Sequence, residues 1–373
     1  MGITDYKTAK DRRDFIKKKL NTNLSDIKKA FIDNEKHVHC ENLLGGISIP
    51  LGVAGPIDIK GNHAKGKYFI PLATTEGALV ASVQRGTKAI SLSKGCQVCA
   101  LRVGITRGPV FFVKSLSQKH RFIKWLESNR AMLAKKAESS SNHLKVIKIE
   151  NTSCGNYIYL RIYYDTSDAM GMNMATIATQ EIINIIEKKA KIKCISIAGN
   201  YDIDKKPAWL NVINKRGFSV EAEAVIKKDI LKKVLKTTAK DVYNVWISKC
   251  MIGSAISGSL GFNAHYANIC AALFVATGQD IAHVVEGSLG ITTVNILDNN
   301  DLYISVSLPS VLLGIIGGGT KLKTQREALS IIKVKSSIEL AEVLAGAVLA
   351  GELSLLASLA EGSLARVHEK LGR

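Results

Sequence analysis

The sequence predicts an α+β fold in which a ferredoxin-like unit is inserted into a larger, mostly helical domain. Over residues 108–198, segments typical of strands and helices follow one another in the order β-α-β-β-α-β, which is the split βαβ motif. After residue 200 the pattern is mainly helical and rich in small residues. The chain has 373 residues, 46% of them hydrophobic and 22% charged, so we expect two or three domains with real cores.

The chain begins with a polar arm and a turn-rich region. Residues 1–40 are rich in lysine, and we expect one or two short helices there. Residues 41–75 contain several glycines and prolines, which is typical of turns between short strands. A helical pattern with one apolar face then runs to about Ser93, and Thr74 or Thr75 is its expected N-cap.

The inserted unit is predicted from changes in hydrophobic period. Its strands show apolar and polar residues in alternation, whereas its helices repeat apolar residues every three or four positions. Three further helices are expected within 324–369. The predicted strands of the unit are 110–114, 144–150, 157–164 and 193–198, and its predicted helices are 118–137 and 171–189.

No segment of the sequence predicts a membrane span. The most apolar stretch is interrupted by Glu342 and Glu352 and by Gly346 and Gly351, whereas a spanning helix needs about 20 nearly uncharged residues. The first residues contain no apolar run of the kind found in secretory signals. We therefore expect a cytoplasmic protein with no membrane partner.

Cysteine usage and charge limit the possible partners. The seven cysteines are scattered, and the single C-x-x-C of Cys96 and Cys99 has no second pair, so we expect neither a disulfide framework nor a metal site. The net charge of +19 attracts anions such as nucleic acids or polyphosphates. Because the lysine runs are typical of solvated helix faces and no nucleic-acid motif is present, we expect no nucleic-acid partner.

Several polar stretches carry candidate reactive side chains, and local pattern leaves two interpretations for each. Glu76 is either a first-turn carboxylate that complements a helix dipole or a functional acid. Lys205 lies in an exposed turn or supplies a fixed cation to a developing oxyanion. Asp280 either caps a helix or is buried and paired. The start of the helix after Asp168 is either an ordinary capped helix or a phosphate cradle.

Seven longer segments in register resemble the 3-hydroxy-3-methylglutaryl-coenzyme A reductase family. The resemblance covers about 41–373, most of the chain. It is carried by ENLLGGISIPLGVAGP, PLATTEGALVASVQRG, DAMGMNM, GNYDIDKKPAWLN, GFNAHYANI, GQDIAHVVEGS and LARVHEKLGR.

The resemblance implies a division of labour along the chain. Residues 41–107 and 208–373 would form the large domain that binds coenzyme A, with 1–40 as a helical arm. Residues 108–198 would be the small NADP-binding domain, and 199–207 the catalytic loop between them. The family works as homodimers or dimers of dimers with active sites at the subunit interface, so the same is expected here.

The resemblance also implies an activity and its residues. The expected reaction reduces (S)-3-hydroxy-3-methylglutaryl-CoA to mevalonate and CoA with two hydrides from NADPH, and the catalytic residues would be Glu76, Lys205, Asp280 and His368, the last as the acid for the leaving thiolate. Substrate contacts are expected from Ser82, Arg107, Asp204, Lys206, Lys249, His265 and Asn268. Cofactor contacts are expected from Asp168, Ala169, Met170, Gly171, Met172 and Asn173.

Some positions depart from the family pattern, and some alternatives stay open. Ala198, Ser167 and Gln84 stand where the family usually has serine, glycine and asparagine. The sequences of these motifs are similar to those of the biosynthetic class I enzymes, which mostly use NADPH. The alternatives are the NAD-dependent degradative direction on the same fold, a basic nucleic-acid-binding protein and a catalytically inactive homologue.

Overall fold

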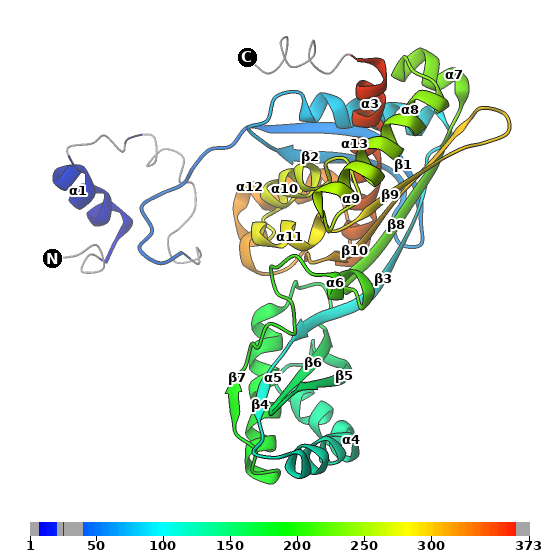
Figure 1. Ribbon diagram of the computed structural model, residues 1–373. Coiled ribbons are helices and arrows are strands. Elements are labelled where there is room, and N and C mark those ends of the chain that lie inside the picture. Colours follow the sequence, from blue (N-terminus) through cyan, green and yellow to red (C-terminus); the bar gives the residue numbers. More distant parts are fainter. Residues whose placement is uncertain (1–6, 21–24, 26–39, 363–373) are drawn as a thin grey trace.

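The computed structural model describes residues 7–20, 25 and 40–362 and confirms the α+β class (Figure 1). Ten strands form one hydrogen-bonded sheet system whose main path runs β7-β4-β6-β3-β8-β10-β9. Its upper part in Figure 1 belongs to the larger, helix-covered body, and its lower part belongs to the inserted unit. The helix at the N-terminal end of the chain is α1 (Ala9–Leu20).

The larger body is less helical than expected, because three long strands follow residue 200. In β8 (Arg216–Ile226), apolar residues from Val220 to Ile226 are buried at every second position, with Glu221 and Glu223 between them. This alternation is a strand signal that the sequence offered. The strands of this body are β1 (Leu51–Gly61), β2 (Lys65–Ala73), β3 (Cys96–Arg107), β8, β9 (Ile291–Ile296) and β10 (Leu302–Val311).

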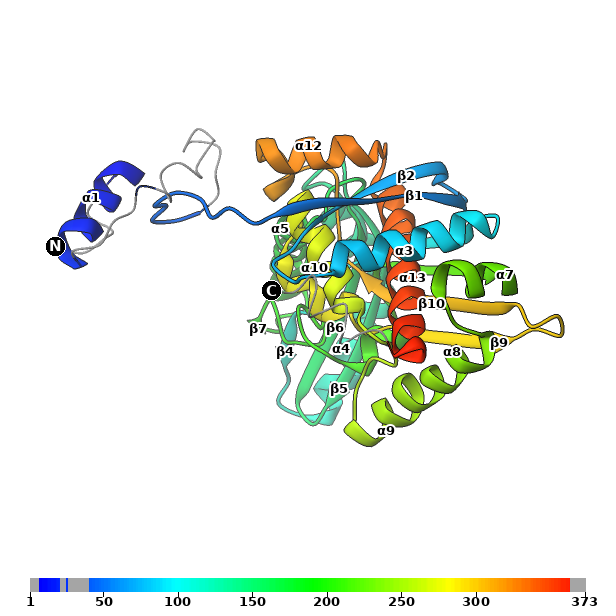
Figure 2. The same cartoon turned by 90° about the horizontal axis from the view of Figure 1, so that it is seen from above.

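Helix α13 (Ser337–Glu361) lies in the centre of this body, beside α3 (Leu79–Leu92) (Figure 2). It is long and apolar enough to cross a membrane, but 78% of its most apolar 18-residue stretch is buried inside the fold, as in a core helix. Its fully buried carboxylates anchor loops: Glu342 accepts from the backbone N–H groups of residues 62–64, and Glu352 from those of residues 264–265.

The inserted unit has the predicted element order and overlaps every predicted range. Its strand order β7-β4-β6-β5 is antiparallel throughout, and α4 and α5 pack on the sheet over a separate core. Its elements are β4 (Val110–Phe112), α4 (Leu116–Glu138), β5 (Lys145–Cys154), β6 (Tyr157–Asp165), α5 (Met172–Lys189) and β7 (Cys194–Ser196).

Two chain crossings join the unit to the larger body. Strand β3 pairs with β8 along most of its length and with β6 at its last three residues, so one strand serves both parts. The chain returns through the segment before α6 (Trp209–Ile213), and the crossings touch where Gly199 donates to the Gly108 carbonyl at 2.6 Å. A side chain at Gly108 would collide with the backbone of Asp202, so the contact requires glycine.

One helical prediction is wrong, and another is tested only in part. Helix α3 begins at Leu79 after Ala78 and has no side-chain cap, whereas the Thr74 hydroxyl accepts from the Glu76 N–H. The predicted threonine N-cap is therefore wrong. Of the three helices expected near the C-terminus, two are present, and the remainder of that range lies outside the described residues. The other helices are α7 (Lys228–Ile230), η3 (Leu231–Leu235), α8 (Ala239–Trp246), η4 (Ile247–Gly253), α9 (Ser254–Ser257), α10 (Tyr266–Thr277), η5 (Ile281–His283), α11 (Val284–Gly287), η6 (Gly318–Lys321) and α12 (Lys323–Ile332).

Candidate active site

A cleft of about 680 Å³ lies where the inserted unit meets the larger body. Its wall combines the start of α5, the loop before α6, the turn after α10 and the glycine-rich loop before α12. Of the predicted site residues, it brings together Arg107, Ala169, Met170, Gly171, Met172, Asn173, Asp204, Lys205 and Asp280.

Lys205 and Asp280 form an ion pair in this cleft. The Lys205 Nζ lies 2.7 Å from Asp280 Oδ2, and both side chains are about a third exposed. Asp280 also caps η5 by accepting from the Ala282 N–H at 3.1 Å, so it both caps a helix and is paired, although it is only half-buried. Burial raises the pKa of Asp280, but the hydrogen bond from Lys205 and the nearby charges outweigh it and leave the pKa below its usual value.

A buried guanidinium lies beneath this pair. Arg216 is fully buried and donates to Asp204 Oδ1 at 2.8 Å, to Glu286 Oε1 at 2.6 Å and to Thr106 Oγ1 at 2.7 Å. Burial alone would raise the pKa of Asp204. The charge and the hydrogen bond of Arg216 have the larger effect, so the pKa lies below its usual value. The sequence did not reveal Arg216, because a Lys-Arg pair near a turn is indistinguishable from solvated charge.

His283 and Glu286 complete this buried cluster and were also missed. Both side chains are fully buried, and the spacing of three residues from Asp280 to His283 and on to Glu286 could have suggested a shared face. Asp204, His283 and Glu286 are residue types that can bind metal, and their ligand atoms lie within 4.8 Å of one another. However, Arg216 already contacts both carboxylates, so this set does not fit a cation site.

The glycine-rich loop allows the two sides of the cleft to approach closely. A side chain at Gly278 would collide with the Gly319 carbonyl, and one at Gly314 would collide with the backbone N–H of Met170. The buried Gln279 amide joins the loops by donating to the Gly314 carbonyl and accepting from the Gly314 N–H. The sequence had identified this loop only as a glycine turn.

The start of α5 faces the cleft without a side-chain cap. Gly171 is the N-cap residue, with a left-handed φ of 89°. Asp168 does not line the cleft: its carboxylate accepts from the backbone N–H and hydroxyl of Ser337 at the start of α13. Ser167 has a φ of 56°, which explains why a glycine suits that position. The Arg107 guanidinium donates a hydrogen bond to the Thr176 hydroxyl and forms an ion pair with Asp202.

A second group of predicted residues lies outside this cleft. Glu76 is exposed and accepts from the Asn268 Nδ2 at 3.3 Å. Ser82 donates to the Ser354 hydroxyl of α13, and His265 donates its N–H to Glu352. Within one chain, none of these side chains lines the cleft that contains Lys205.

The remaining predicted residues are dispersed. Lys206 is exposed beside the cleft, and its Nζ reaches the Asp204 carbonyl at 3.4 Å. Lys249 lines a separate hollow of about 570 Å³ that also includes Pro207. His368 lies outside the described residues.

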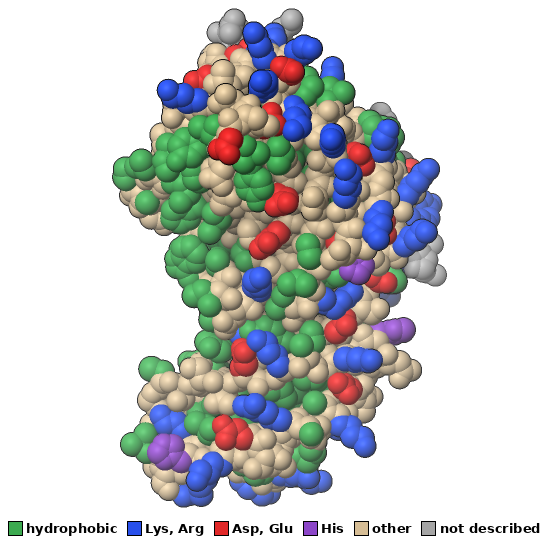
Figure 3. All heavy atoms as spheres, turned by 90° about the vertical axis from the view of Figure 1, so that its right-hand side faces the viewer, with side chains coloured by type: hydrophobic (Ala, Val, Ile, Leu, Met, Phe, Trp, Pro, Cys, Tyr) green, Lys and Arg blue, Asp and Glu red, His purple; other side chains and the backbone are tan. Residues whose placement is uncertain are grey.

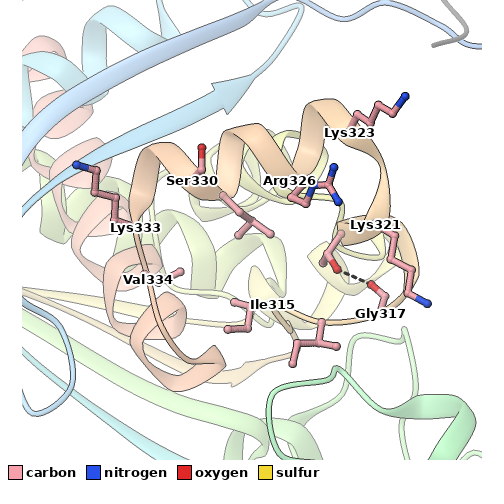
Figure 4. A pocket seen from close by; sticks show the side chains of 11 residues that line it. Ile315, Gly317, Lys321, Lys323, Arg326, Ser330, Lys333 and Val334 are labelled. Atoms are coloured by element: carbon pink, nitrogen blue, oxygen red, sulfur yellow. Dashed lines mark hydrogen bonds between the residues drawn. The ribbon is translucent and has the colours of Figure 1, made fainter. Parts of the chain in front are cut away.

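A basic hollow of about 840 Å³ adjoins the cleft and shares Ile316, Gly317 and Thr320 with it. Figure 4 shows its cationic side chains along α12 and at both of its ends. Its described lining contains no carboxylate. The basic residues of this hollow are Lys321, Lys323, Arg326 and Lys333.

Comparison with known proteins identifies one family. The sequence model of hydroxymethylglutaryl-coenzyme A reductase matches residues 8–373. The 3-hydroxy-3-methylglutaryl-coenzyme A reductase of Aeropyrum pernix is 45% identical, over 97% of this chain and 89% of its own. That of Methanocaldococcus jannaschii is 46% identical, over 97% and 92%. Among solved structures, the class II 3-hydroxy-3-methylglutaryl-CoA reductase of Streptococcus pneumoniae bound to NADPH superposes with a TM-score of 0.71 at 18% identity, covering 96% and 98% of the two chains.

Proposed function

The chain belongs to the hydroxymethylglutaryl-coenzyme A reductase family, and on that premise we propose that it reduces (S)-3-hydroxy-3-methylglutaryl-CoA to mevalonate and CoA with NADPH. The observation that carries the proposal is the Lys205–Asp280 ion pair, which lies in a cleft bordered by the start of α5. A fixed cation beside an open cleft is what reduction of a thioester carbonyl requires.

The cleft suits a dinucleotide. When bound, NADPH supplies the hydride for each of two successive reductions. The uncapped start of α5 offers backbone N–H groups to phosphate, and the glycines of the facing loop let a ligand approach the backbone. We therefore assign 108–198 as the NADP-binding domain, 199–207 as the catalytic loop, and 41–107 with 208–373 as the substrate-binding domain.

The chain's own residues would handle charge and protons. Lys205 would stabilise the oxyanion that forms on the carbonyl, and a donor of this kind contributes about 3 kcal/mol in comparable sites. His368 would protonate the leaving CoA thiolate, and Glu76 would supply the proton of the new alcohol. Because Glu76 is exposed and outside the cleft in one chain, we propose a homodimer or dimer of dimers that brings a second chain to the site.

His368→Gln separates the two reductions. We expect it to slow reduction of the thioester while it spares reduction of added mevaldehyde, because only the first stage releases a thiolate. Steady-state rates with each substrate measure this. Equal losses on both substrates would refute the role of His368.

The decisive experiment counts NADPH oxidised per CoA thiol released. The proposal requires about two, since each reduction consumes one hydride. A ratio near one, or no thiol release, would contradict it.

Rates with NADH and NADPH in both directions address the degradative alternative. The class I assignment stays a prediction, because the solved structures share only the fold at this identity. The cytoplasmic location also stays a prediction.

A further inference from the structure

Three buried polar atoms behind the Lys205–Asp280 pair have no hydrogen-bond partner within the described part of the chain. They are Nδ1 and Nε2 of His283 and Oε2 of Glu286. An unsatisfied buried polar atom costs about 1–3 kcal/mol, so three together in one place require an explanation.

The imidazole of His283 lies between two carboxylates. Its Nδ1 is 3.5 Å from Glu286 Oε2, and its Nε2 is 3.9 Å from Asp280 Oδ2. That same Asp280 oxygen lies 2.7 Å from Lys205 Nζ. Both imidazole distances exceed the usual hydrogen-bond length by only about 0.5–1 Å. A small movement of the ring or of Asp280 therefore completes a series from Glu286 through His283 and Asp280 to Lys205.

Glu286 is fixed independently at one end of this series. Its Oε1 accepts from the Arg216 guanidinium and from the backbone N–H of Lys205, both at 2.6 Å. Its Oε2 is left facing the imidazole. One buried carboxylate thus holds the lysine backbone with one oxygen and has the other available for His283.

The surrounding charges favour a donor at both ring nitrogens. The charged groups at this cluster are Asp280 and Glu286 on the segment of His283, Asp204 and Lys205 on the catalytic loop, and Arg216 from β8. Three carboxylates and two cations leave one negative charge in excess. An imidazole with a proton on each nitrogen would neutralise that charge and could donate to Glu286 and Asp280 together.

We propose that His283, held by Glu286, is a positioning residue that orients Asp280 and, through it, the ammonium of Lys205. The inference rests on the proposed function. As oxyanion charge develops on the substrate and attracts Lys205, His283 becomes the donor that satisfies Asp280. The Lys205 cation is then available to the reacting oxygen without leaving the half-buried Asp280 carboxylate unpaired.

Two substitutions test the series from Glu286 through His283 to Asp280 separately from the fold. His283→Gln removes the ring that faces both carboxylates, and we expect kcat to fall about 100-fold with little change in KM. In Glu286→Gln the retained oxygen can still accept from Arg216 and the Lys205 N–H, while the amide turns a donor toward Nδ1. We expect it to reproduce the loss. The exposed His63→Gln is the matched control and should behave as wild type.

A measurement without substrate separates this inference from the proposed function. Lys205 should react with acetic anhydride about 3-fold faster or more in His283→Gln than in wild type, because a poorly oriented Asp280 stabilises the ammonium less. Peptide mass spectrometry gives the rates, and thermal unfolding checks the fold. Wild-type kcat and wild-type labelling of Lys205 in a folded His283→Gln would overturn the role of His283. A wild-type Glu286→Gln would overturn the role of Glu286. Failure of the wild-type enzyme to oxidise NADPH would count only against the proposed function.

Discussion

At the level of single residues, the structure constrains Lys205 at both ends. Its backbone N–H donates to Glu286, its Nζ pairs with Asp280, and its φ of 56° is a left-handed conformation that is uncommon for residues other than glycine. A side chain held this way loses little entropy when it meets a substrate, which suits a group that must face a developing charge.

Lys205→Ala should therefore remove activity and keep the fold. We expect kcat to fall by about 10² to 10³, as when an oxyanion donor is lost, with thermal unfolding nearly unchanged. NADPH oxidation with the acyl-CoA substrate measures it. Lys215→Ala is the matched control, because Lys215 shares the left-handed backbone, with a φ of 60°, outside the cleft. Retained kcat in Lys205→Ala would exclude the lysine from the mechanism.

The ion pair of Asp204 with Arg216 makes the free energy of unfolding depend on pH in the acid range. Because its pKa is lowered in the fold, the carboxylate stabilises the protein above its ordinary pKa, and this contribution is lost as pH falls through the lowered value. Asp204→Asn should lower the free energy of unfolding by about 2 kcal/mol at neutral pH. The gap from wild type should narrow below about pH 4. Urea unfolding at several pH values measures it, with the exposed Asp298→Asn as control. A gap independent of pH would contradict the role of the ion pair with Arg216.

The site residues divide by the kind of signal they leave in sequence. Lys205 and Asp280 stand in polar motifs that resemble a known family, and the structure brings them together. Arg216 lies outside those motifs, and His283 and Glu286 stand inside one of them without a polar pattern that marks them as functional. Burial of a charged side chain depends on partners from distant segments. Sequence pattern gives the faces of single elements but not which faces meet.

At the level of elements, the period of hydrophobic residues predicted the helices and strands of the inserted unit well and those of the larger body less well. Every strand and helix of the unit overlaps its predicted range, because its strands and helices differ clearly in hydrophobic period. Strands β8 and β10 were missed among small residues, although both alternate buried and outward positions. Glu342 and Glu352 were interpreted as interruptions of an apolar stretch, whereas in the fold they accept hydrogen bonds inside the core.

Glu342→Gln tests that anchoring role. An amide presents a donor to backbone N–H groups of residues 62–64 that need acceptors, and each unsatisfied group costs about 1–3 kcal/mol. We expect a loss of about 3 kcal/mol in the free energy of unfolding, measured with denaturant. The exposed Glu327→Gln of α12 is the control. A loss no larger than that of the control would show that the loop does not depend on Glu342.

At the scale of the whole molecule, the net charge of +19 is not gathered into one stripe on the face seen in Figure 3. Lysine and arginine side chains are interspersed there with aspartate and glutamate, as on a solvated surface. The basic hollow beside the cleft differs, because its described lining contains four cations and no carboxylate. Its position next to the cleft predicts electrostatic attraction of the two proposed ligands, the acyl-CoA substrate and NADPH, because both carry phosphates.

Reversing charge at this hollow should slow the binding of substrate without changing the rate of the chemical steps. For the double substitution Arg326→Glu and Lys333→Glu, we expect kcat/KM at low ionic strength to fall about 10-fold and kcat to change little, because a steering field acts on encounter. The difference should disappear near 0.5 M salt, where screening shortens the field to about 4 Å. Lys232→Glu with Lys233→Glu makes the same charge change on η3, away from the lining of the hollow, and should have a smaller effect. Equal effects of the two double variants would mean that the total charge, rather than this hollow, attracts the substrates.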